Sequence, residues 1–122
     1  MPTAKAAMPF SYPYDHTDPA STGCSLHTQT PYNVSDSAIE IQLRYSTTCY
    51  TAWARSITNQ YIKYTLSAQR SNDGAHEDFS YDLGGAYTYQ LYDAGSLHTR
   101  AYVSYYWVLT PWSTGSLATY YW

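Results

Sequence analysis

Charged residues are scarce in this chain of 122 residues. Six Lys and Arg stand against nine Asp and Glu, so charged residues make up 12% of the chain and the formal net charge is −3. The basic residues are scattered, which excludes a cationic stripe along phosphates, and we expect no nucleic-acid partner. The only lysines are Lys5 and Lys63, although lysine is a usual guard against pairing between sheet edges.

Aliphatic residues are also few, since Leu, Ile, Val and Phe together number 17. That share is typical of disordered proteins when charge is high, but here charge is low. No stretch approaches the roughly 18–20 apolar residues of a membrane span, so we expect no transmembrane segment. Residues 1–7 contain one lysine and are followed by no apolar run, so no signal peptide is visible. If the protein is exported, we expect this chain to be the mature form or to have lost its start.

The motifs of common catalytic and metal sites are missing. The four histidines lie far apart in the sequence, without the spacing of a zinc site. No Gly-x-Ser-x-Gly elbow surrounds a serine, and the acidic turns do not fit the spacing of an EF-hand. The sequence therefore predicts a protein that is not an enzyme and that holds no metal or cofactor.

Aromatic residues are abundant, with 16 Tyr and four Trp. A buried aromatic side chain contributes about 150–250 Å² of area, so tyrosine must supply much of the buried apolar area. A domain of this size cannot bury all of these rings, and we expect many of them to face outward.

Alternating apolar and polar residues predict β-strands. The clearest case is 38–45, where Ile39, Ile41, Leu43 and Tyr45 alternate with polar residues. The expected strands are 38–45, 49–57, 61–69, 79–83, 86–92, 97–109 and 117–122. Without any helical period, the pattern indicates an all-β fold, an antiparallel β-sandwich or partly closed barrel of about seven strands.

The chain divides into an N-terminal arm and one domain. Residues 1–14 contain three prolines, which favour an extended path, and residues 15–122 form a single β domain. Asp, Thr, Pro and Gly over residues 14–24 predict turns, and Asn72-Asp73-Gly74 predicts a tight turn between strands.

Two cysteines, Cys24 and Cys49, bear on the cellular compartment. They are either a disulfide in an exported protein or two buried thiols in a cytosolic one. The Ser-, Thr- and Tyr-rich, Lys-poor composition favours the disulfide, and no Cys-x-x-Cys spacing points to redox or metal chemistry.

Two stretches carry a family resemblance. They are Asp18-Pro19-x-x-x-Gly23-Cys24 and Ile41-x-Leu43-Arg44-Tyr45-Ser46-x-x-Cys49-x-x-x-Trp53-Ala54-Arg55. Over residues 14–57 the chain resembles DUF2690, the YjfA-like proteins, which are small exported bacterial proteins of unknown function. The resemblance implies export and a Cys24–Cys49 bridge, and it supplies no catalytic residues. After residue 61 the similarity is loose, and the aromatic second half looks like an elaboration of this chain.

Three residues within these stretches are expected to be structural, with ligand binding as the alternative: Arg44, Trp53 and Arg55. We expect Trp53 to face inward with Cys49, Thr51 and Ile57. The two arginines are expected to cross one sheet face and to bind a carboxylate such as that of Glu40 or Asp18.

An aromatic surface with little charge suggests self-association, because Tyr and Trp are enriched at interfaces whereas Lys and Glu are depleted. We therefore expect an exported structural protein that associates with itself, as a subunit of an extracellular filament or of the cell surface. An extended arm adds a strand to a neighbour in such assemblies. The alternative is a module that binds cell-wall polysaccharide. The residues expected at an interface or under a sugar are Phe10, Tyr12, Tyr14, Tyr102, Tyr106, Trp112, Tyr120 and Trp122.

Overall fold

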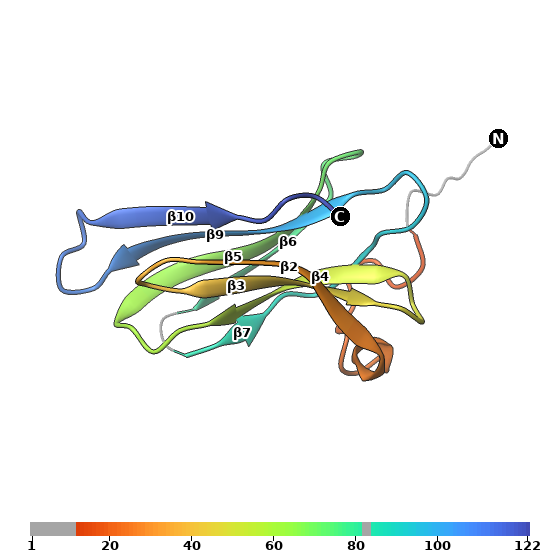
Figure 1. The fold of residues 1–122 in the computed structure, drawn as a ribbon, viewed down its shortest axis with the longest axis horizontal. Helices are drawn as coiled ribbons and strands as arrows, with labels where there is room; N and C mark the ends of the chain where they lie inside the picture. The colour runs from red at the N-terminus through yellow and green to blue at the C-terminus, as the bar shows by residue number, and fades with distance from the viewer. Residues whose placement is uncertain (1–11, 82–83) are drawn as a thin grey trace.

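Two antiparallel β-sheets lie face to face in the computed structural model, which describes residues 12–81 and 84–122 (Figure 1). The fold is an all-β sandwich, as the alternation of residues predicts, and the sheets do not close into a barrel. The one helical segment in the described part of the chain is a 3₁₀ turn at Cys24–Leu26. None of its helices is long and apolar enough to cross a membrane.

The first sheet has the order β2-β3-β4-β7, with β8 also pairing with β4. Its strands are β2 (Thr28–Ser35), β3 (Glu40–Ser46), β4 (Thr51–Ile57), β7 (Ala86–Tyr87) and β8 (Leu91–Tyr92). The sequence did not lead us to expect β2. Its residues are mostly polar, and Pro31 is tolerated because β2 is an edge strand.

The second sheet has the order β10-β9-β5-β6. Its strands are β5 (Ile62–Arg70), β6 (His76–Tyr81), β9 (Thr99–Trp107) and β10 (Thr114–Ala118). The turn predicted between β5 and β6 is confirmed, because Gly74 there has a φ of 73°. Strand bounds differ from our expectation by a few residues, and the expected strand 86–92 is two short strands, β7 and β8.

The core lies between the sheets and is built from small and branched side chains. Their members from the two inner faces include Ile41, Leu43, Ala52, Ala54, Ile62, Leu66, Ala68, Ala101 and Val103. Of the sixteen tyrosines, only Tyr64 is buried. The expectation that many rings face outward is therefore confirmed, and Tyr64 is the one tyrosine within the core cluster, with Tyr32, Tyr45 and Tyr105 packed against it.

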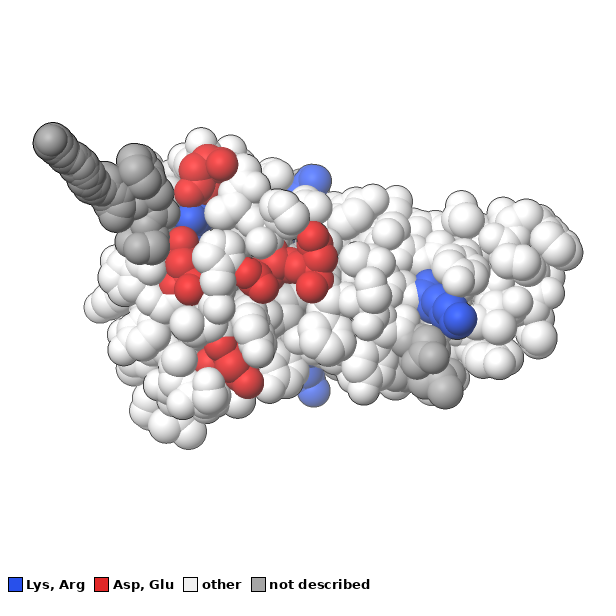
Figure 2. Space-filling model, turned by 180° about the vertical axis from the view of Figure 1, so that it is seen from behind, with Lys and Arg blue, Asp and Glu red and all other residues white. Residues whose placement is uncertain are grey.

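Acidic residues gather toward one end of the sandwich. Figure 2 shows Asp and Glu over one half of the face seen from behind, while the other half is almost free of charge. Asp15 and Asp73 belong to the charged end, where both bind Arg70 at the end of β5. The opposite end holds the connection from β9 to β10, and residues 108–122 contain no charged side chain.

Candidate functional site

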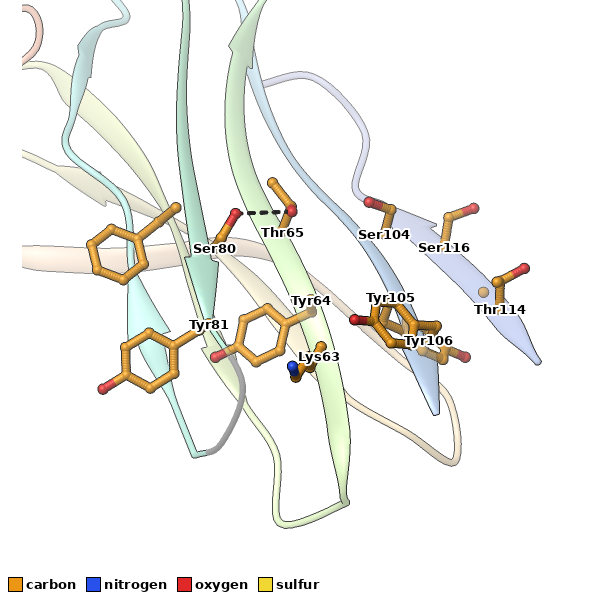
Figure 3. A pocket seen from close by; sticks show the side chains of 12 residues that line it. Lys63, Tyr64, Thr65, Ser80, Tyr81, Ser104, Tyr105, Tyr106, Thr114 and Ser116 are labelled. Atoms are coloured by element: carbon orange, nitrogen blue, oxygen red, sulfur yellow. Dashed lines mark hydrogen bonds between the residues drawn. The ribbon is translucent and has the colours of Figure 1, made fainter. Parts of the chain in front are cut away.

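A groove of about 1070 Å³ runs over the sheet formed by β10, β9, β5 and β6 (Figure 3). Its lining residues are Lys63, Tyr64, Thr65, Phe79, Ser80, Tyr81, Ser104, Tyr105, Tyr106, Thr114, Gly115 and Ser116. Lys63 is the one charged residue among them, and none is a carboxylate. The groove is therefore nearly free of charge. Tyr106 shares the outward face with the hydroxyl residues of the lining, whereas Tyr64, Phe79, Tyr81 and Tyr105 alternate onto the core side of the same strands.

Four hydroxyl side chains cross this sheet in one row. The strand register pairs Thr65 with Ser80 on one side and with Ser104 on the other, and Ser104 with Ser116. These residues point away from the core, because Leu66 and Val103, which alternate with them, are buried inside. Neighbouring strands lie about 4.8 Å apart, so the row places a hydroxyl at roughly that interval. Thr65 and Ser80 already share a hydrogen bond of 3.2 Å.

Tyr106 and Tyr102 lie on either side of this row. Both are on β9 with Ser104 midway between them, and alternation directs all three away from the core. Tyr106 is 39% exposed and is paired in register with Lys63 and Thr114. Four residues along a strand separate the two ring positions by about 13 Å.

The Tyr102 ring is held by its neighbours. The Arg100 guanidinium lies over it at 5.7 Å from the ring centroid, and also over Tyr121 at 5.0 Å. Nε of Arg100 donates to the side-chain carbonyl of Gln69 at 2.9 Å, which fixes the guanidinium on the same face. These contacts hold the Tyr102 ring in one orientation.

The Tyr105 side chain lies on the core side of the sheet, beneath the groove. Its ring lies against Gly115, where an added β-carbon would overlap the ring, so only glycine fits there. Its hydroxyl donates to Oδ2 of Asp36 at 2.6 Å, and this hydrogen bond, with burial, raises the pKa of the Tyr105 phenol to about 12. The contact ties β9 to the turn between β2 and β3 in the opposite sheet.

The expected disulfide is confirmed. Cys24 and Cys49 are bonded, with their Cα atoms 5.6 Å apart, and Cys24 is buried. The bond fastens the 3₁₀ turn to the connection between β3 and β4.

The expected direction of Trp53 is wrong. Ala52 and Ala54 face the core, so alternation places Trp53 and Thr51 on the opposite side of β4, although Trp53 is only 4% exposed there. Ile57 is 41% exposed, and Cys49 precedes the strand. Sequence alternation identified the two faces but not which one meets the other sheet, because both faces of β4 are covered.

The expected arginine–carboxylate pairs are also wrong. Arg44 donates to the hydroxyls of Thr30 and Thr28 at 2.6 and 2.7 Å, and Arg55 donates to Gln42 at 3.3 Å. Among the described residues neither arginine forms an ion pair with Glu40 or Asp18. Arg44 instead joins β3 to β2 beside the β-bulge in β2.

The described part of the arm docks on its own domain. Tyr12 stacks on Tyr92 with ring centroids 5.7 Å apart, and the Arg70 guanidinium lies 4.9 Å from the Tyr12 ring. Tyr14 is 46% exposed, and Phe10 lies outside the described residues. Sequence reasoning missed Arg70, because nothing in the alternation marks an arginine at a strand end as buried.

The aromatic residues near the C-terminus do not line the groove. Trp112 and Tyr120 are each 79% exposed, beyond the two ends of β10. Trp122 packs edge-on against Tyr45 and Tyr32, which lie in the other sheet. Of the residues predicted from the sequence, the groove contains only Tyr106, with Tyr102 beside it. Sequence reasoning missed the hydroxyl row, because only the strand register shows that the four residues lie side by side on adjacent strands.

Comparison with known proteins finds one relationship. A family model described as "Protein of unknown function (DUF2690)" matches residues 12–102. We had expected clear similarity only over residues 14–57. The match extends far beyond residue 57 and reaches into β9, so that expectation was too narrow. No curated protein and no solved structure matches the chain. Because the model covers more than half of the residues, and the motifs around Cys24 and Cys49 lie within it, the chain belongs to the DUF2690 family.

Proposed function

We propose that the protein is an exported, non-catalytic module that binds a polysaccharide along the groove over β10, β9, β5 and β6. The observation that carries this proposal is the row of Ser80, Thr65, Ser104 and Ser116 with Tyr102 and Tyr106 on either side.

The chemistry of the groove fits a sugar chain. Each Ser or Thr hydroxyl donates one hydrogen bond and accepts others, which matches the hydroxyls along the edges of a sugar ring. The flat tyrosine rings offer apolar surface for the faces of the sugar, with a polar atom at the tip. Hydroxyls at intervals of about 4.8 Å suit an extended polymer better than a compact small molecule.

A non-catalytic role agrees with the lining of the groove. Most glycoside hydrolases use a pair of carboxylates at the scissile bond. The groove has no Asp or Glu in its lining, and Asp78 is bound to Ser67 at 2.7 Å on the next row of the sheet. Export is supported by the Cys24–Cys49 disulfide, since such bonds persist in oxidising compartments.

Retention on insoluble peptidoglycan, chitin and cellulose tests the proposal. We expect at least one polymer to retain the protein and Tyr106→Ala to lower the affinity at least tenfold, because it removes the exposed ring in the groove. Tyr89→Ala is the matched control, since Tyr89 is 47% exposed but lies outside the groove. Failure of all three polymers to retain the folded protein contradicts the proposal.

The other expectation from the sequence, an exported subunit that associates with itself, stays a prediction, and the edge strand β10 is the part of the described chain that would carry it.

A further inference from the structure

The four strand edges of the sandwich differ in how they are protected. The edge strand β6 contains Glu77 and Asp78, and charged side chains discourage pairing with another chain. The edge strand β2 contains Pro31 and a register shift that breaks its ladder. At the remaining edge of that sheet, β7 and β8 are two residues long each. These three edges are poor templates for a further strand.

The fourth edge, β10, has none of these guards. Its five residues are Thr-Gly-Ser-Leu-Ala, without charge or proline, and in the described part of the chain it pairs with β9 alone. The N–H of Thr119 donates to Ala101, and the carbonyl of Ser113 accepts from Trp107, so the odd-numbered residues face β9. Alternation in an antiparallel ladder then turns the backbone N–H and C=O groups of Thr114, Ser116 and Ala118 toward the free edge.

We propose that β10 pairs antiparallel with β10 of a second copy of this chain, with Ser116 of each copy opposite the other. In this register Thr114 of one copy lies opposite Ala118 of its partner. Every outward N–H of the three residues then meets an outward carbonyl of the partner strand. The same surface serves both copies, so the contact closes as a two-fold dimer and does not propagate into a filament.

The side chains along β10 are complementary to themselves in this register. On the inner side, Leu117 of one copy lies opposite Gly115 of the other, so two bulky side chains do not meet there, and the Tyr105 ring of the same copy already fills the place of the missing β-carbon. Beyond the ends of the strand, the Trp112 end of one copy meets the Tyr120 end of the other. Both side chains are 79% exposed in the single chain, and such large exposed rings are typical of interface anchors. Like-charged side chains do not oppose each other across this contact, because residues 108–122 contain no charged side chain.

The dimer also extends the groove, a consequence that rests on the proposed function. Ser116 ends the hydroxyl row at the free edge, and the two-fold axis passes beside it. The row of one copy therefore continues directly into that of the other, on the same face of one eight-stranded sheet. A polymer then spans two half-sites, which favours long chains over short oligosaccharides.

Sedimentation equilibrium of the full chain without any glycan tests the dimer. We expect the mass of the wild-type protein to rise from 13.9 kDa toward twice that value as its concentration increases. In Ser116→Lys the lysines of the two copies lie opposite each other at the two-fold axis and repel. Ser116→Pro removes a backbone N–H that the contact needs, so we expect both variants to stay at the monomer mass. Ser104→Lys is the matched control on the same row and should dimerise like the wild type. Wild-type protein that stays monomeric throughout, or a Ser116→Lys variant that dimerises equally well, overturns the proposal.

Amide exchange of the wild-type protein gives a second readout that needs no variant. The N–H groups of Thr114, Ser116 and Ala118 should be protected at high concentration and should exchange rapidly after dilution. Rapid exchange at both concentrations overturns the proposal. Because neither measurement contains a sugar, a dimer that binds none of the three polymers retains the inference and removes only the proposed function.

Discussion

Arg70 and Asp15 form a buried, two-pronged ion pair although 55 residues separate them in the sequence. Nη1 and Nη2 of Arg70 lie 2.8 and 2.9 Å from the two carboxylate oxygens of Asp15, and the two side chains are 1% and 2% exposed. Nη1 also donates to the backbone carbonyl of Tyr92. The pair holds the segment after the arm against the ends of β5 and β8.

Removal of one partner should destabilise the fold strongly. We expect Asp15→Asn to lower the free energy of unfolding by about 3–5 kcal/mol, because it leaves a buried guanidinium with one carboxylate partner fewer. Urea denaturation measures the change. Asp73→Asn is the control: its side chain is 39% exposed, so the loss should be about 1 kcal/mol or less. Equal effects of the two substitutions would show that burial of the Asp15 pair is not what matters.

Asp93 should make stability depend on pH near neutrality. It is 5% exposed, and burial raises the pKa of its carboxyl to about 7 from 3.8. A raised pKa means that the folded state holds a proton that the unfolded state releases. The stabilisation is therefore complete below about pH 4 and is lost as the pH rises through 7, with a limiting slope of about 1.4 kcal/mol per pH unit.

The Asp93→Asn variant isolates this contribution. Its free energy of unfolding should lack the decline seen in the wild-type protein between about pH 4 and 7, as measured by urea denaturation at several pH values. Identical pH profiles of the two proteins would rule out Asp93 as the group responsible.

The disulfide should contribute a large part of the stability. It links residues 25 apart in the sequence, and closing such a loop in the unfolded chain is worth about 3 kcal/mol in the chain-entropy treatment. We expect the double variant Cys24→Ala, Cys49→Ala to unfold at a correspondingly lower urea concentration. Adding a reductant should shift the wild-type transition in the same direction while leaving the variant unchanged.

Gly115→Ala should destabilise the sandwich through Tyr105. The added methyl group overlaps the phenol ring, and relief of such crowding in a packed sheet costs about 1–3 kcal/mol. In a Tyr105→Ala background the same substitution should cost much less, which a double-mutant cycle of unfolding free energies measures. An unchanged cost in both backgrounds would place its origin in the backbone of Gly115.

Local patterns predicted several strands well. The strand expected at 61–69 is present as β5, and its alternating residues Ile62, Tyr64, Leu66 and Ala68 are buried. It did not reveal β2, because an edge strand with a polar sequence and a proline has little apolar periodicity. It also misassigned Trp53, since a strand covered on both faces gives no sign of which face meets the core.

Of the candidate site, the sequence predicted the aromatic residues but not the row of hydroxyl groups. Tyr102 and Tyr106 stand out in the sequence as outward rings on a long strand, whereas Ser80, Thr65, Ser104 and Ser116 are ordinary serines and threonines on four separate segments. Their alignment depends on the register of three strand pairs, one of which, β5 with β9, joins segments distant in sequence. Register is set by inward packing and by turn geometry, and no single segment contains that information.

The sequence by itself determined that strands would form and that many tyrosines would stay at the surface, and its composition favoured a bond between the two cysteines. These outcomes follow from local alternation, from composition and from the ratio of surface to volume in a small domain. Tertiary structure alone decided which hydroxyls stand in one row and which edge is left free of charge. The reason is that both depend on the order and offset of strands, which are fixed when distant segments pack together.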